Sequence, residues 1–189
     1  VDIKESAESI RNLLVVLANP SGDCDDTFMS LLLKAVQEVW DRKENEALID
    51  DIVQFMQEAI QQPEYRDTTT VRARMEEIIV GLDKYCSWGI YGAYFNSKKP
   101  SLDDNVRFSV LEMGGLKDKP DLLAAVMFSM MIYVEQRMYL SDRQQPKVCL
   151  IDEAWKLLSK DNKRAEDFIE NGYRTARKYN GAYITITQG

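Results

Sequence analysis

KVCLIDEAWKLLSK, residues 147–160, places two carboxylates, Asp152 and Glu153, directly after an apolar run, residues 148–151. A short apolar run of this kind predicts a buried strand. The first acid can hold a water molecule of a phosphate-bound Mg²⁺, and the second can deprotonate the water that attacks the phosphate. The stretch therefore predicts half of a site for ATP hydrolysis. The alternative is that both acids are ordinary strand-end residues facing solvent.

Two more strands are predicted on either side of this stretch. Residues 106–111 precede it, and residues 182–187, rich in β-branched side chains, follow it. Helices are predicted between the strands, over residues 120–140 and from about residue 161 to 179. The order strand, helix, strand, helix, strand implies crossover connections and a parallel sheet. We therefore expect an α/β core with about three parallel strands.

Polar side chains follow two of these strands at the point where each strand ends. Asp152 and Glu153 follow the central strand, and Gln188 follows the last one. Ligands of an open parallel sheet bind beyond the carboxyl ends of its strands. We therefore expect these three side chains to share one rim of the sheet, where they could surround a terminal phosphate.

The helix before the last strand carries three cations, Arg174, Arg177 and Lys178, spaced to share one helical face. Either arginine could reach the γ-phosphate of a nucleotide across a subunit boundary, as an arginine finger does. The alternative is that these cations only complement the helix dipole. Gly172 in the same helix weakens it by about 1 kcal/mol relative to alanine, so we expect close packing at that position. Asn180 is expected to end the helix in a left-handed turn.

The amino-terminal half of the chain predicts helices only. Apolar residues recur every three or four positions in four stretches, at about residues 1–17, 26–40, 47–61 and 70–85. The glycine- and proline-containing segment that follows them breaks this pattern. We therefore divide the chain into an all-helical subdomain, residues 1–95, and an α/β core, residues 96–189.

Composition excludes several classes of protein. The net charge of −7 and the pI near 4.8 argue against a surface that binds nucleic acid directly. The chain has no histidine, and its three cysteines lack CxxC spacing, so a histidine triad or a zinc site is not expected. The longest apolar stretch, residues 122–134, is shorter than the roughly 20 residues that cross a bilayer.

The phosphate-binding signature GxxxxGK[ST] is absent from these 189 residues. The chain alone is therefore expected not to hydrolyse ATP, and it looks like a piece of a longer protein. Without a strand that carries the phosphate-binding loop, one sheet edge and some apolar surface would lack their cover. We therefore expect the piece to self-associate.

Four stretches of the chain resemble the TraC-type pilus-assembly ATPases of F-type conjugative type IV secretion systems. They are VCLIDEAWKLL, ENGYRTARKYNGAYITITQ, LEMGGLKDKPDLLAAVMFSMMIYVEQRMY and YGAYFNSKKPSL. The resemblance covers nearly the whole chain. It implies a partial RecA-like P-loop NTPase core, with the phosphate-binding loop on the amino-terminal side of the matched region. It also implies that Asp152 and Glu153 are the Walker B acids and that Gln188 senses the γ-phosphate or its water. Arg174 and Arg177 match the arginine-bearing motif of the family.

The same resemblance implies ATP and Mg²⁺ as cofactors and a cytoplasmic ATPase that docks at the inner membrane. Members of the family act as oligomers, often hexamers, with inner-membrane components of the secretion system. Two other interpretations stay open. A DNA-translocating motor of the same superfamily would share the acids and arginines, and a non-catalytic module would use its helices only to bind a partner.

Overall fold

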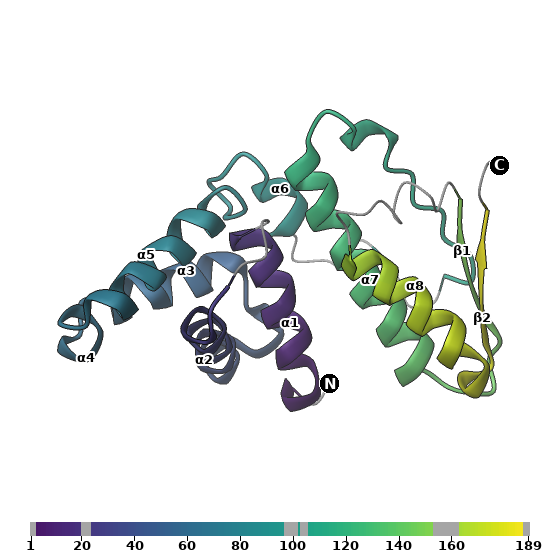
Figure 1. The fold of residues 1–189 in the computed structure, drawn as a ribbon, viewed down its shortest axis with the longest axis horizontal. Helices are drawn as coiled ribbons and strands as arrows, with labels where there is room; N and C mark the ends of the chain where they lie inside the picture. Colours follow the sequence, from purple (N-terminus) through teal and green to yellow (C-terminus); the bar gives the residue numbers. More distant parts are fainter. Residues whose placement is uncertain (1–2, 20–23, 97–101, 103–105, 153–162, 187–189) are drawn as a thin grey trace. The chain divides into compact units, whose positions relative to one another are not determined.

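The computed structural model describes the chain except for residues 1–2, 20–23, 97–101, 103–105, 153–162 and 187–189 (Figure 1). The chain forms two compact units, residues 1–125 and residues 126–189. We call the first the helical unit and the second the sheet unit, and each is described by itself. The units divide within the long helix α7, Pro120–Leu140, rather than near residue 95, and the predicted subdomain boundary stays a prediction.

The helical unit contains the helices predicted from the apolar periodicity. The longer ones are α1, α2, α3 and α5, and their contacts with one another form the framework of the unit (Figure 1). Short helices and turns connect them. The bounds are α1 Ile3–Ala18, α2 Asp26–Lys43, η1 Glu44–Glu46, α3 Ile49–Ala59, α4 Pro63–Arg66, α5 Thr69–Asp83, α6 Gly92–Phe95 and η2 Gly114–Leu116.

The helix ends of this unit follow from local chemistry. Asp25 caps α2, because its carboxylate accepts a hydrogen bond of 2.8 Å from the Phe28 N–H. Asp51 turns back in the first turn of α3 and accepts a hydrogen bond of 2.9 Å from the Leu48 N–H. Pro63 begins α4, where a missing N–H leaves no helical bond unmade.

One apolar core holds the helical unit together. Its least accessible side chains come from all four long helices and include Leu17, Phe28, Leu32, Val53, Met56, Ile78 and Leu82. Gly81 marks the point where α5 and α1 approach most tightly, because a Cβ atom there would lie 2.1 Å from the Ala18 carbonyl oxygen. A side chain at this position would therefore force the two helices apart.

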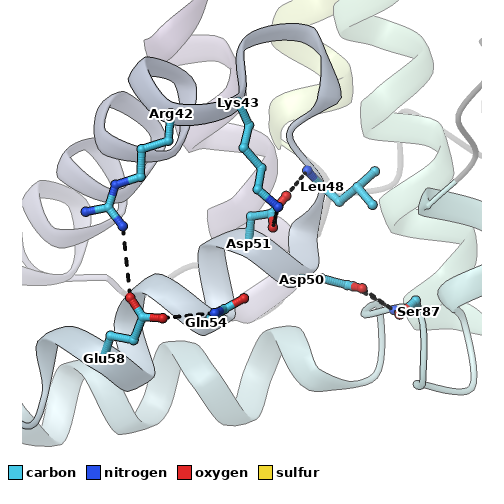
Figure 2. A network of polar contacts seen from close by, with 8 residues as sticks. All are labelled: Arg42, Lys43, Leu48, Asp50, Asp51, Gln54, Glu58 and Ser87. Atoms are coloured by element: carbon cyan, nitrogen blue, oxygen red, sulfur yellow. Dashed lines mark hydrogen bonds and ion pairs between the residues drawn. The ribbon is translucent and has the colours of Figure 1, made fainter.

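A polar network joins the surfaces of α2 and α3 (Figure 2). Lys43 pairs with Asp51 at 2.6 Å, and Arg42 lies 3.9 Å from Glu58. These charges are exposed or only partly buried, and exposed ion pairs contribute little to stability. The network therefore adds little to the stability of the helical unit.

The strand predicted over residues 106–111 is wrong. This segment is irregular in the structure. Its apolar residues alternate in the sequence, but Val106, Phe108 and Val110 are all exposed, and Phe108 is 81% exposed. No pairing partner for it occurs in the described part of the chain. A strand needs the hydrogen bonds of a neighbour, and alternation alone does not supply them.

The sheet unit packs helices on a small parallel sheet. After α7 come β1 Lys147–Ile151, α8 Lys163–Thr175, η4 Ala176–Tyr179 and β2 Gly181–Thr185. The two strands pair in parallel, from Lys147 opposite Gly181 to Ile151 opposite Thr185. Two strands are thus present in the described residues where about three were predicted. Asn180 has a φ of 56°, which confirms the left-handed turn before β2.

The two faces of this sheet differ. One face packs on a small core that includes Met131, Met138, Phe168, Ile169 and Tyr183. Gly172 is part of this packing, because a Cβ atom there would lie 2.6 Å from the Tyr183 ring, which confirms the predicted close approach. The opposite face carries four apolar side chains that are 45 to 64% exposed: Val148, Leu150, Ile184 and Ile186.

None of the helices that the structure describes is both long enough and apolar enough to cross a bilayer.

Candidate functional site

The carboxyl edge of the sheet is where the predicted acids and glutamine would meet. Asp152 follows β1 directly and is exposed. The Ile186 N–H donates a hydrogen bond of 2.9 Å to the Ile151 carbonyl, so the two chain segments are still paired where β1 ends. Glu153 and Gln188 lie outside the described residues. Their meeting with Asp152 at one rim therefore stays a prediction.

Tyr173 ties α8 to this same edge. Its hydroxyl oxygen lies 3.1 Å from the Thr185 N–H nitrogen, which donates to it, and 2.8 Å from Thr185 Oγ1. The contact fixes the last residue of β2 against the helix that carries Arg174. The sequence gives no signal for it, because a tyrosine on an amphipathic helix does not reveal which strand its hydroxyl reaches.

The predicted cationic segment spans two kinds of helix. Helix α8 ends at Thr175, and the chain tightens into the 3₁₀ turn η4, which contains Arg177 and Lys178. The shared cationic face of Arg174, Arg177 and Lys178 stays a prediction. Arg174 pairs with Glu170 at 2.5 Å, one turn earlier on α8, and its side chain stays 72% exposed.

Arg177 lies toward the amino edge of the sheet, not the carboxyl edge. The turn η4 leads directly into β2, and the Lys147 N–H donates a hydrogen bond of 3.1 Å to the Asn180 carbonyl at the start of β1. Lys147 Nζ also lies 3.3 Å from the Tyr179 carbonyl oxygen. The length of β1, about 13 Å at 3.3 Å per residue, separates this edge from Asp152. The backbone at Arg177 therefore lies at the end of the sheet opposite to Asp152, and a role for Arg177 in the predicted site stays a prediction.

A group of titratable side chains lies beneath the sheet. Burial raises the pKa of Glu135, of Cys149 and of Tyr183. The Tyr139 hydroxyl is hydrogen-bonded to Thr175 Oγ1 at 2.8 Å. Because a raised pKa keeps the Cys149 thiol protonated at neutral pH, this group is poorly suited to nucleophilic chemistry.

The described residues contain no cluster of three or more acidic or cysteine side chains that could hold a metal ion by themselves. The exposed Asp152 fits a nucleotide-bound Mg²⁺, because this ion keeps several waters and is bound through one or two carboxylates together with substrate phosphates.

Sequence comparison places the chain in a known class. The whole chain, residues 1–189, matches the TraG P-loop domain, and the chain belongs to that family of P-loop NTPase domains.

Within this class, the chain is 51% identical over 187 residues to Protein TraC of Escherichia coli K12. The match covers 99% of this chain and 21% of that protein. The resemblance to the TraC-type family that the sequence motifs predict is therefore confirmed.

The fold resembles that of VirB4 of Thermoanaerobacter pseudethanolicus, with a TM-score of 0.69 at 18% identity. The similarity covers 98% of this chain and 65% of the VirB4 chain. Together with the family match, it shows a P-loop NTPase-like α/β fold, which agrees with the predicted fold class at this coarser level. The chain spans only part of either relative.

Proposed function

We propose that this chain is part of a type IV secretion ATPase that hydrolyses ATP with Mg²⁺ to power conjugative pilus assembly. The observation that carries the proposal is the 51% identity to TraC over 187 residues, in a chain that belongs to a P-loop domain family. The exposed Asp152 at the carboxyl end of a parallel strand supports the same conclusion, because P-loop folds bind nucleotides at that edge. In this proposal the sheet unit is part of a larger RecA-like core.

The acids and the glutamine have separate roles in this proposal. Asp152 holds a water of the Mg²⁺ ion, which neutralises charge that develops on the phosphates. Glu153 accepts a proton from the attacking water, and Gln188 hydrogen-bonds to that water or to the γ-phosphate. The pairing that reaches Ile186 beside Ile151 supports a common edge for the two chain segments that lead to these residues.

The arginines act across a subunit boundary in this proposal. Arg177 lies toward the sheet edge opposite Asp152, which favours contact with the nucleotide of a neighbouring chain over contact with its own. Arg174 is also exposed and is the second candidate. An arginine supplied in trans requires an oligomer, and we propose a hexamer.

The remaining assignments rest on the TraC-type relationship. We propose a cytoplasmic protein at the inner membrane that contacts the inner-membrane components of the secretion system. Direct binding of nucleic acid is not part of the proposal, and the net charge of −7 supports leaving it out.

The general-base role can be tested in the longer protein that contains this chain and a phosphate-binding loop. Glu153→Gln should retain ATP binding and lower the turnover rate by roughly 10² to 10⁴, the usual contribution of a general base. Asp167→Asn, which also removes one carboxylate but from the exposed surface of α8, serves as the control. Turnover of Glu153→Gln at the parental rate would remove Glu153 from this role. Turnover that rises strongly on addition of DNA would favour the DNA-translocating motor instead.

The trans role of the arginine has its own test. Arg177→Ala and Glu153→Gln subunits are each expected to form inactive rings. Mixed rings should regain part of the activity, because some sites then combine an intact Glu153 with an intact Arg177 from the neighbour. Mixed assembly without any rescue, with mixing verified by mass spectrometry, would contradict the trans role.

A further inference from the structure

The segment that follows α5 and ends in the short helix α6 presents large apolar side chains to solvent. Trp88 is 59% exposed, Ile90 79% and Tyr94 50%, all within seven consecutive residues. Single exposed apolar side chains are common on proteins and need no explanation. Three within seven residues are unusual, and exposed apolar side chains that gather in one place mark interaction sites.

The backbone of this loop is fixed. The Gly89 N–H donates to the Cys86 carbonyl at 2.7 Å, and the Tyr91 N–H donates to the Lys84 carbonyl at 2.8 Å. A Cβ atom on Gly89 would lie 2.4 Å from the Asp83 carbonyl oxygen, and one on Gly92 would lie 2.2 Å from the Cys86 carbonyl oxygen. The loop conformation therefore depends on these glycines.

Side-chain contacts also hold the loop against the rest of the helical unit. The Tyr85 ring is fully buried and contacts the Phe95 ring edge-on, with centroids 5.2 Å apart. On the side facing α3, the Ser87 N–H and hydroxyl both donate to the Asp50 carboxylate, at 2.7 and 2.5 Å (Figure 2). The exposed side chains thus stand on a preorganised base, which lowers the entropy lost when a partner binds.

Trp88 is oriented for contact with a cation. Its indole N–H donates to Asp83 Oδ1 at 2.9 Å, which fixes the ring beside an exposed carboxylate. Tyr94 already has the Lys119 ammonium 5.9 Å from its ring centroid, whereas no cation covers the Trp88 ring among the described residues. Tryptophan is the strongest cation–π acceptor among the aromatic side chains.

The charge of the surrounding region points to the same kind of partner. Residues 1–95 contain 18 acidic and 9 basic residues, a net charge of −9. A net negative charge attracts a basic segment, and Asp83 lies directly at Trp88, while Lys84 and Lys119 lie near the same segment. The net negative charge also disfavours a membrane anchor role for Trp88 and Tyr94, because the inner leaflet is anionic. A second copy of the same acidic region would be repelled in the same way.

We propose that the Trp88 loop, residues 83–95, is a docking site for a basic, apolar segment of a partner protein. The partner places an arginine or lysine over the Trp88 indole beside the Asp83 carboxylate. It places an aliphatic side chain against Ile90. The preformed loop and the acidic surroundings together define this partner chemistry.

Synthetic peptides in fluorescence anisotropy test the proposal with the 189-residue chain. The first peptide alternates leucine and arginine, the second replaces arginine by glutamate, and the third replaces leucine by serine. The first should bind most tightly, and its affinity should fall as salt is added. Absence of binding at about 1 mM, a free energy near −4 kcal/mol, would overturn the proposal. Equal binding of the glutamate peptide would overturn it as well.

Substitutions in the chain locate the binding site. Trp88→Ala should weaken binding of the leucine–arginine peptide by about tenfold or more, as expected for an aromatic hot spot. Ile90→Ser and Asp83→Asn should each weaken it by less. Val80→Ala is the matched control, because Val80 is 75% exposed on α5 of the same unit. Unchanged affinity in both Trp88→Ala and Ile90→Ser would show general attraction to an acidic protein and would overturn the proposal.

Two further measurements test whether the loop binds a membrane or a second copy of the chain instead of a partner protein. Binding to vesicles with anionic lipids that is lost in Trp88→Ala would assign the loop to a membrane and overturn a protein partner. Self-association that is lost in the same variant, measured by sedimentation, would assign the loop to a second copy. We expect neither change. Far-UV circular dichroism and urea midpoints equal to those of the parent verify that each variant is folded.

Discussion

The helical unit and the sheet unit differ in how they cover their apolar side chains. In the helical unit, Leu17, Phe28 and Leu32 are almost inaccessible, because four amphipathic helices enclose one core. In the sheet unit, helices cover one face of the sheet, and Leu150 and Ile184 are exposed on the other. Parallel sheets are normally covered on both faces. The comparison shows that the helices of the helical unit enclose their own core, whereas the sheet unit leaves one face of its sheet exposed.

The largest expected effect concerns the close approach of α5 to α1 in the helical unit. Gly81→Ala would place a Cβ atom 2.1 Å from the Ala18 carbonyl oxygen, and a backbone atom cannot turn aside as a side chain can. We expect a loss of about 3 kcal/mol or more in the free energy of unfolding. Urea unfolding followed by far-UV circular dichroism measures it.

Gly115→Ala is the control for this substitution, because no atom lies within 4 Å of the Cβ position there. Its effect should stay within about 0.5 kcal/mol. Equal urea midpoints for Gly81→Ala and Gly115→Ala would show that α5 and α1 are not tightly packed at Gly81.

A glycine-to-alanine substitution in the sheet unit should lower the free energy of unfolding by less. Gly172→Ala brings a Cβ atom to 2.6 Å from the Tyr183 ring, which is a side chain and can shift more easily than a backbone atom. We expect a loss of about 1–3 kcal/mol. Hydrogen exchange should accelerate in β1 and β2 while α2 and α3 keep their protection. Faster exchange in α2 as well would show that the two units unfold together.

A charged substitution on the exposed sheet face tests whether this face causes self-association. Leu150→Lys should weaken self-association of the chain by about tenfold or more, and it should lower binding of the dye ANS, because it interrupts an apolar patch. Its effect on folding should be below about 1 kcal/mol, since the side chain is 57% exposed. Val80→Lys, on an exposed position of α5, should leave both measurements unchanged. Self-association that is equal in all three proteins would assign it to another surface.

Local sequence patterns determine much of the architecture described above. The apolar periodicity predicts α1, α2, α3 and α5, and the proline at position 120 and Asn180 mark the start of α7 and the turn before β2. These features depend on residues close in the chain, so the sequence displays them.

Features that depend on distant residues could not be predicted in the same way. Residues 106–111 alternate like a strand, yet a strand also needs a neighbour, and the described part of the chain supplies none. The contact of Tyr173 with Thr185 and the separation of Arg177 from Asp152 likewise depend on how α8 packs on the sheet. The site residues Glu153 and Gln188 stay predictions from the sequence.

One further effect on stability appears only at high pH and comes from a buried thiol. Burial raises the pKa of Cys86 from 9.0 to about 12, so the folded chain keeps this proton where the unfolded chain loses it. Stability should therefore be unaffected below pH 9 and should fall as the pH rises from 9 toward 12. Comparing urea midpoints of the parent and Cys86→Ala across this range isolates the contribution. Parallel pH profiles for the two proteins would contradict it.

Thiol labelling at constant pH tests the burial of Cys86 directly. Cys86 is fully buried in the helical unit, whereas Cys24 and Cys149 are partly exposed. Alkylation by iodoacetamide at pH 8 should reach Cys24 first and Cys86 only after unfolding. Rapid labelling of Cys86 in the native chain would show that this core opens readily.

The central claim is that the carboxyl edge of this sheet forms part of a nucleotide site in a secretion ATPase. A structure of the longer protein with Mg²⁺ and a non-hydrolysable ATP analogue tests it most directly. We predict Asp152 about 4 Å from the Mg²⁺ ion, with one water between them, and Arg177 nearest to the nucleotide of an adjacent subunit. A nucleotide bound away from this edge, or a Glu153 side chain that points away from the γ-phosphate, would contradict the account.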